Sequence, residues 1–96
     1  MIRHTVVFRL KHAKGSAAET AFLSAADVLA TIPGVKKFEK LRQVSKKNGY
    51  AFGFSMEFDD AAGYAGYNDH LEHTRFVRER WIPEVEEFLE IDYERI

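Results

Sequence analysis

Residues 2–10 alternate regularly between mostly apolar and mostly polar side chains, and this alternation predicts an extended strand. One face of this strand would carry Ile2, His4, Val6, Phe8 and Leu10, and the other would carry Arg3, Thr5, Val7 and Arg9. A period of two is typical of a β-strand whose faces meet different surroundings. The chain must therefore supply further strands and a layer that covers the apolar face.

A helix is predicted next, over residues 16–32. Ser16 suits the N-cap position, and Glu19 three residues later completes a capping box. The helix should stop at the Pro-Gly pair 33–34. Residues 35–44 are rich in lysine and are interpreted as an exposed edge strand, which a turn at 46–49 follows.

The second half of the chain repeats this alternation of strand and helix. Residues 51–58 predict a strand, because four large apolar residues share one face and small residues share the other. A short helical stretch over 60–68, broken by its two glycines, and a second helix over 70–81, ended by Pro83, should follow. Residues 88–93 alternate again and predict the last strand, whereas 84–88 allow no assignment.

The resulting order, β-α-β-β-α-β, is that of the α+β ferredoxin-like fold, with a four-stranded antiparallel sheet. Right-handed crossovers place both helical layers on one face of the sheet. The length of 96 residues suits a single domain that spans residues 1–96.

Composition narrows the classes of function. The net charge of −1 gives no global attraction to nucleic acid or to anionic lipid. The absence of cysteine excludes a disulfide framework, a thiolate nucleophile and Cys-based metal sites. No apolar run is long enough to span a membrane, and the N-terminus lacks the apolar core of a signal peptide, so we expect a cytoplasmic protein.

The face of the sheet away from the helices should contact water in a monomer, yet part of it is apolar. Val7, Leu89, Ile91 and Tyr93 fall on this face. A contiguous apolar patch usually marks an interaction site. A homodimer that packs two such faces together is the leading interpretation, and a monomer with a half-polar exposed sheet is the alternative.

Four segments carry a family resemblance that extends over the whole chain: residues 1–11, residues 32–35, residues 67–77 and residues 91–93. Together, in this order and spacing, they resemble the stress-responsive A/B-barrel (Dabb) domains. The resemblance implies a dimeric α+β barrel. The wider superfamily includes small-molecule enzymes. Within the family itself, some plant members cyclise polyketides and most bacterial members have no assigned reaction, so the fold alone does not fix an activity.

The resemblance also suggests catalytic residues. In the cyclising members, a Tyr and a His act at the motif positions that Tyr67 and His73 occupy here, the His as general base and the Tyr as a group that polarises a carbonyl. Leu71 departs from the motif, in which proline commonly follows the first His. The alternative is that His73 caps or packs the helix and that Tyr67 belongs to the core.

His4 is the one polar residue on the apolar face of the first strand. A buried imidazole needs a hydrogen-bond partner, and Asp92 on the last strand is a candidate. His4 is therefore either a third catalytic residue or a satisfied structural one. His4, His70 and His73 together would suit a three-histidine metal site. The sequence His-Leu-Glu-His at residues 70–73 is not a metalloprotease pattern, however, so we predict neither metal nor cofactor. His70 is interpreted as a helix-cap residue.

Apolar residues beside these groups complete the candidate site: Phe22, Phe54, Met56 and Phe76, with Asp92 as a polar contact. They would either line a pocket for a small apolar molecule or fill a solid core. The leading hypothesis is a homodimer that binds a small apolar carbonyl compound, with metal-free isomerisation, cyclisation or decarboxylation as the chemistry if it is an enzyme. The alternatives are a non-catalytic stress or interaction protein whose dimer is the functional unit, and a partner module of a neighbouring enzyme.

Overall fold

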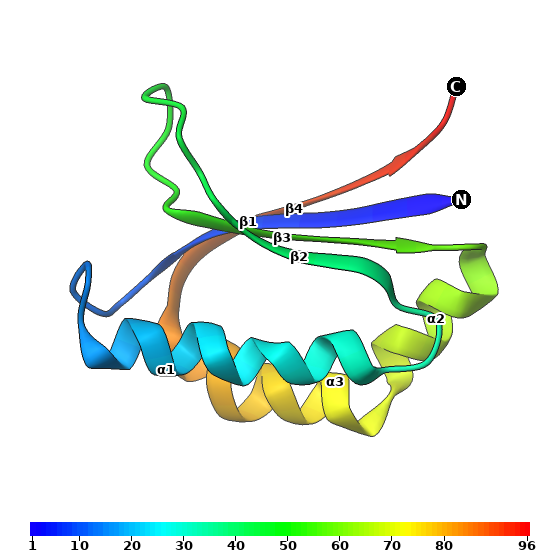
Figure 1. The fold of residues 1–96 in the computed structure, drawn as a ribbon, viewed down its shortest axis with the longest axis horizontal. Coiled ribbons are helices and arrows are strands. Elements are labelled where there is room, and N and C mark those ends of the chain that lie inside the picture. The colour runs from blue at the N-terminus through cyan, green and yellow to red at the C-terminus, as the bar shows by residue number, and fades with distance from the viewer.

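The computed structural model describes residues 1–96 and shows one antiparallel sheet covered on one face by helices (Figure 1). The strands are β1 (Ile2–Leu10), β2 (Lys36–Arg42), β3 (Phe52–Phe58) and β4 (Val85–Glu94), in the sheet order β2-β3-β1-β4. This order, with the helices between β1 and β2 and between β3 and β4, confirms the ferredoxin-like fold.

The helical layer has two parts. The first is α1 (Ala17–Ala25), extended by a 3₁₀ segment, η1 (Ala26–Thr31). The second is α2 (Ala61–Asp69), α3 (Leu71–Phe76), a π-helical turn, η2 (Val77–Trp81), and the short α4 (Ile82–Glu84). Both parts lie beneath the same face of the sheet (Figure 1), as right-handed crossovers require.

Local sequence signals explain where these helices begin. The Ser16 hydroxyl accepts a hydrogen bond from the Glu19 amide at 3.2 Å, which confirms the predicted N-cap. The Glu19 carboxylate accepts from Gly15 rather than closing the box on Ser16. Asp60 caps α2 by accepting from the Gly63 amide at 2.8 Å. With this cap in place α2 continues through Gly63 and Gly66, so the prediction that these glycines break it was wrong.

The second helix also continues further than the sequence suggested. Ile82, which we expected to be extended because Pro83 follows it, has helical backbone angles, with φ −58° and ψ −47°. Its amide donates to the carbonyl of Val77, five residues earlier, in the π-helical turn. The wider turn leaves room for the proline ring, and the helix ends one residue later, at Glu84.

Strand β4 is longer than the predicted 88–93 because residues 85–87 join it through β1. Leu10 pairs with Val85 and Arg9 with Glu87, and the register shifts between these two pairs. The Arg9 guanidinium binds the carboxylates of Glu86 at 2.8 Å and Glu87 at 2.5 Å. Two acidic residues therefore lie within a strand because a cation on the neighbouring strand compensates them.

The core lies between the sheet and the helices, on the face that the alternation of residues 2–10 predicted. Phe8 is fully buried, and its ring packs 4.7 Å from that of Phe54 and 5.7 Å from that of Phe22. Gly34, at the turn before β2, has φ +89° and approaches the Gly63 backbone, a conformation that suits glycine. These contacts fix the distance between the helical layer and the sheet.

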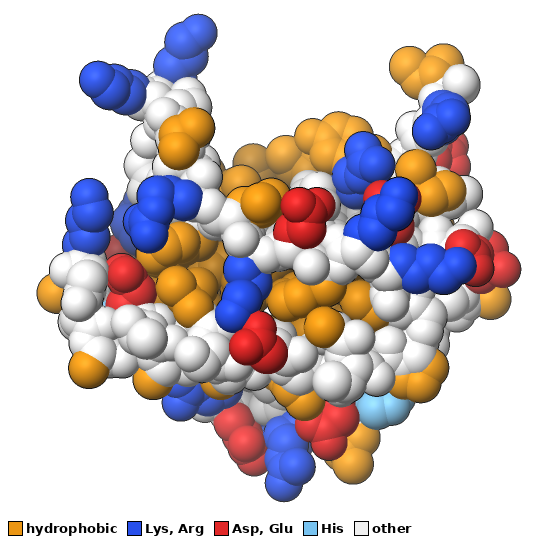
Figure 2. Space-filling view, in the orientation of Figure 1, with side chains coloured by type: hydrophobic (Ala, Val, Ile, Leu, Met, Phe, Trp, Pro, Cys, Tyr) orange, Lys and Arg blue, Asp and Glu red, His pale blue; other side chains and the backbone are white.

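The edge strand β2 has no buried residue, which agrees with its interpretation as an exposed lysine-rich strand. Figure 2 shows Lys and Arg side chains around the gap between sheet and helices, through which apolar side chains are visible. None of the helices has the length and apolar character that crossing a membrane requires.

Candidate functional site

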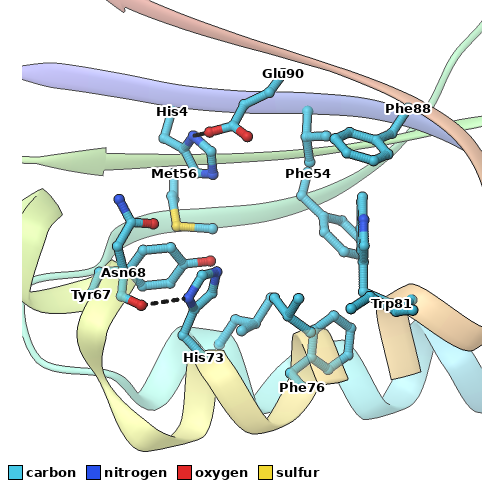
Figure 3. Close-up of a pocket in the computed structure, with 14 residues that line it drawn as sticks. His4, Phe54, Met56, Tyr67, Asn68, His73, Phe76, Trp81, Phe88 and Glu90 are labelled. Carbon is cyan, nitrogen blue, oxygen red and sulfur yellow. Dashed lines mark hydrogen bonds and ion pairs between the residues drawn. The ribbon is translucent and has the colours of Figure 1, made fainter. Parts of the chain in front are cut away.

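A cavity of about 280 Å³ lies between the helices and the β3-β1-β4 side of the sheet (Figure 3). A cavity of this volume is near the lower limit of ordinary small-molecule sites. Its wall is mostly apolar, with a polar group of residues at one end: His4, Tyr67, Asn68, His73 and Glu90. The three residues predicted to carry chemistry thus border one cavity rather than a solid core.

His4 reaches this cavity from β1. In the sheet it pairs with Asp92 on the neighbouring strand β4. It is only 7% exposed, and its Nδ1 atom lies 2.6 Å from the Asp92 carboxylate. Because the carboxylate accepts the Nδ1 proton, the Nε2 atom carries the free lone pair of the neutral ring. Nε2 points into the cavity in Figure 3. The contact predicted between His4 and Asp92 is therefore present.

Tyr64, from α2, connects this pair to a second carboxylate. Its hydroxyl lies 2.9 Å from the His4 Nδ1 atom, 2.8 Å from Asp92 Oδ2 and 3.0 Å from Glu90 Oε1. Burial, reinforced by the hydrogen bonds to these carboxylates, raises the pKa of Tyr64, so its hydroxyl stays protonated. His4, Glu90 and Asp92 have donor atoms that could hold a metal ion, and the Tyr64 hydroxyl, with one proton to donate to these carboxylates, lies among them.

His73 lies across the cavity on α3. Its Nδ1 atom is 3.0 Å from the carbonyl oxygen of Asn68, and since a carbonyl only accepts, Nδ1 must donate the proton. The second ring nitrogen, Nε2, is then a free acceptor, and in Figure 3 it points into the cavity. Burial lowers the pKa of His73, which keeps the ring neutral at pH 7.

Tyr67, on α2 and six residues before His73, contributes a donor. Its side chain is 2% exposed, its ring centroid lies 4.4 Å from that of His73, and its hydroxyl points into the cavity (Figure 3). The hydroxyl forms no hydrogen bond with another protein group, and burial raises the pKa of the phenol. Although the residue as a whole is buried, the hydroxyl oxygen is not an enclosed polar atom that lacks a partner, because it borders the open space of the cavity.

A sequence profile of one family matches residues 2–95, under the description "Stress responsive A/B Barrel Domain". The chain belongs to this Dabb family. No curated protein matches the chain.

Solved structures place this Dabb chain among ferredoxin-like proteins. A Dabb family protein from Mesorhizobium loti is 60% identical and has a TM-score of 0.97, with 99% of this chain and 96% of that one covered. A dimeric ferredoxin-like protein of unknown function from Thermobifida fusca is 21% identical, with a TM-score of 0.80 and coverages of 98% and 90%. A hydroxynitrile lyase from Passiflora edulis is 17% identical, with a TM-score of 0.83 and coverages of 96% and 90%.

The opposite end of the cavity in this Dabb protein is aromatic. Phe54 and Phe76, which the sequence suggested, line it together with Trp81 and Phe88, which it did not (Figure 3). Trp81 and Phe88 pack edge to face, with 5.5 Å between ring centroids. The cavity therefore has a hydrogen-bonding end and an aromatic end.

The structure brings together six of the residues predicted for the site: His4, Phe54, Met56, Tyr67, His73 and Phe76. Phe22 is outside the wall because its ring is fully buried behind Phe54 and Phe76. Asp92 is also outside and contacts the cavity only through His4. His70 caps α3 by accepting from the Glu72 amide, as its interpretation as a cap residue predicted, and does not line the cavity.

Sequence reasoning missed several residues of the wall: Val6, Leu29, Asn68, Val77, Trp81, Ile82, Phe88 and Glu90. For two of them the sequence held a usable signal. Phe88 and Glu90 alternate in step with Asp92, so a partner role for Asp92 already placed both on the helix-facing side of β4. Tyr64, three residues before Tyr67 on the same helix, could have been found by the helical period.

Proposed function

We propose that this Dabb protein binds a small apolar carbonyl compound in the cavity and transfers protons on it by acid–base chemistry. One observation carries the proposal: the free Nε2 atom of His73 and the unpartnered hydroxyl of Tyr67 face the same apolar cavity. A neutral imidazole accepts a proton, and a protonated phenol donates a hydrogen bond to a developing oxyanion. Neither group has a protein partner for these functions.

The chemistry follows from these positions. His73 Nε2 removes a proton from the carbon next to the carbonyl, and the electron pair of that C–H bond forms the enolate. The Tyr67 hydroxyl stabilises the enolate oxygen by a hydrogen bond. Return of the proton from the imidazolium to another carbon gives an isomer, and attack of the enolate carbon on a second carbonyl of the same molecule gives a ring.

His4 supplies a second proton-transfer group on the opposite wall. Asp92 orients its ring and stabilises the imidazolium that forms when Nε2 takes up a proton. A cyclisation also needs a proton for the second carbonyl oxygen, and His4 can supply it once its Nε2 atom has taken up a proton from water. A hydroxynitrile lyase shares this fold at 17% identity, so the architecture is one that an enzyme uses.

Exchange of carbon-bound hydrogen measures the proposed step directly. We expect the protein to accelerate exchange of the acidic hydrogens of phenylacetone in D₂O, followed by proton NMR. His73→Ala and Tyr67→Phe should each lower the catalysed rate by about 10²-fold. His12→Ala is the matched control, because His12 binds Glu84 outside the cavity. Exchange at the buffer rate with the wild-type protein, or an unchanged rate in His73→Ala, would contradict the assignment.

We also propose a homodimer through the free face of the sheet. Leu89, Ile91 and Tyr93 are 48%, 39% and 54% exposed there, beside Val7 on β1. Such a group of apolar side chains on one sheet face favours a second copy over water. The dimeric relative from Thermobifida fusca supports this reading. The exposed face also favours the second candidate function, a non-catalytic protein whose dimer is the functional unit.

A further inference from the structure

The cavity lacks any cationic anchor. No Lys or Arg lines its wall, and the one carboxylate that does so is that of Glu90. A site that binds a carboxylate or phosphate group normally presents Arg, Lys or free backbone amides to it. At the start of α3 the amide of Glu72 is not free for such a ligand, since it donates to the His70 side chain at 3.1 Å.

The surroundings of Glu90 add negative charge rather than compensate it. Its carboxylate lies 3.7 Å from the His4 Nδ1 atom, which Asp92 already binds at 2.6 Å, so two carboxylates share one imidazole. Even with His4 protonated, the three groups together carry a net negative charge. Tyr64 contributes a neutral hydroxyl. The remaining titratable groups in the wall are uncharged at pH 7, because burial lowers the pKa of His73 and raises the pKa of Tyr67.

We propose that the cavity selects uncharged carbonyl compounds and rejects the corresponding carboxylates, with Glu90 as the residue that sets this specificity. This inference rests on the proposed function, because it concerns the ligand of the same cavity. The polar end offers His4, Tyr67 and His73 to a neutral oxygen and places a carboxylate beside them. A ligand carboxylate there would lose part of its hydration and face a like charge, that of Glu90, whose side chain is 49% exposed, so water screens part of the repulsion.

The inference narrows the reactions open to the site. Decarboxylation of a free acid needs the carboxylate at the reacting end and is therefore disfavoured. Aldehydes, ketones, lactones and enols remain, since each presents a neutral oxygen to the Tyr67 hydroxyl. An aromatic or alkyl group of the same molecule would lie against Trp81 and Phe88 at the opposite end.

Three ligands of nearly equal shape test the selectivity: phenylacetone, phenylacetamide and phenylacetate. Their dissociation constants would be measured at pH 7.5 by NMR titration of the labelled protein. We expect both neutral compounds to bind the wild-type protein at least about tenfold more tightly than phenylacetate. Repulsion between the ligand carboxylate and that of Glu90, about 6 Å apart at an intermediate dielectric constant, produces a ratio of dissociation constants of this size. Glu90→Gln should reduce this ratio severalfold.

Glu94→Gln is the control. Glu94 lies on the same strand and faces the same side as Glu90, and its removal changes the net charge equally, but it does not line the cavity. Phenylacetate binding to the wild-type protein as tightly as phenylacetone would overturn the selectivity and leave the proposed function standing. The role of Glu90 would be overturned if both Gln variants changed the affinity ratio equally, or if Glu90→Gln left the ratio unchanged. Failure of both neutral ligands to bind would overturn the proposed function and this inference with it.

Discussion

Replacement of Tyr67 by phenylalanine separates function from stability. The ring is 2% exposed and packs against His73, and Phe keeps this packing, so the variant loses only the hydroxyl. A buried hydroxyl without a partner costs about 1–3 kcal/mol of folding free energy when fully desolvated. Because this hydroxyl borders a cavity, it recovers part of that cost. We therefore expect Tyr67→Phe to raise the free energy of unfolding by about 0–1 kcal/mol while proton exchange on phenylacetone falls.

The matched variant is Tyr64→Phe, in the same helix. Its hydroxyl lies 2.8 Å from Asp92 and 3.0 Å from Glu90 and has one proton to donate to them, so its removal breaks a hydrogen bond to a charged group. Such bonds contribute about 1.5–3 kcal/mol when buried, and we expect a loss of about 1 kcal/mol because these carboxylates are partly exposed.

Urea unfolding followed by circular dichroism measures both changes, with equal slopes in the two variants as the check that the unfolding reaction is the same. Opposite signs for the two tyrosines are the expected result. A loss of more than about 1 kcal/mol in Tyr67→Phe would show that its hydroxyl is paired in the folded protein, and the reasoning for its catalytic role would fail.

Three further predictions concern pH, backbone and assembly. Burial lowers the pKa of His73 in the folded protein, so the unfolded chain takes up a proton first as the pH falls below about 6.5. The wild-type protein should therefore lose stability below this pH relative to His73→Gln, whereas above pH 7 the free energies of unfolding of the two should depend equally on pH. Urea unfolding at pH 5.0 and 7.5 measures the difference, and parallel pH profiles would contradict the prediction. Gly34→Ala should lower the free energy of unfolding by about 1–2 kcal/mol, because φ is +89° there, and an unchanged denaturation midpoint would refute the strain argument. Ile91→Lys should convert a dimer to a monomer in sedimentation velocity at micromolar concentration, and a monomeric wild-type protein would overturn the dimer proposal.

Regular alternation made most of the sheet predictable. Residues 2–10 and 51–58 each have one face in the core and one outside it, so the period of two alone locates them. The start of β4 was not predictable in this way, because residues 86 and 87 owe their place to Arg9 on another strand. The continuation of the helix past Pro83 likewise depends on a π-helical turn that has no signal in single-residue propensities.

The site was predictable as far as one strand and one motif could show it. His4 is conspicuous on an apolar face, and the resemblance pointed to Tyr67 and His73. The aromatic end was not predictable, because Trp81 and Phe88 meet only after the chain has turned from helix into strand. Nor could the sequence distinguish Phe22, which fills the core, from Phe76, which lines the cavity, since both lie on helical stripes.

The π-helical turn at Val77–Trp81 amounts to one residue inserted into an α-helix. Each residue of an α-helix advances the side chains by about 100° around its axis, so deletion of one residue within 78–80 would restore an α-helix and rotate Val77 relative to Trp81 by that amount. One of the two would then leave the cavity wall. The number of residues in this turn, more than the identity of any side chain, would then decide the shape of the aromatic end. A variant with Glu79 deleted should fold with its acid–base groups intact but lose affinity for phenylacetone.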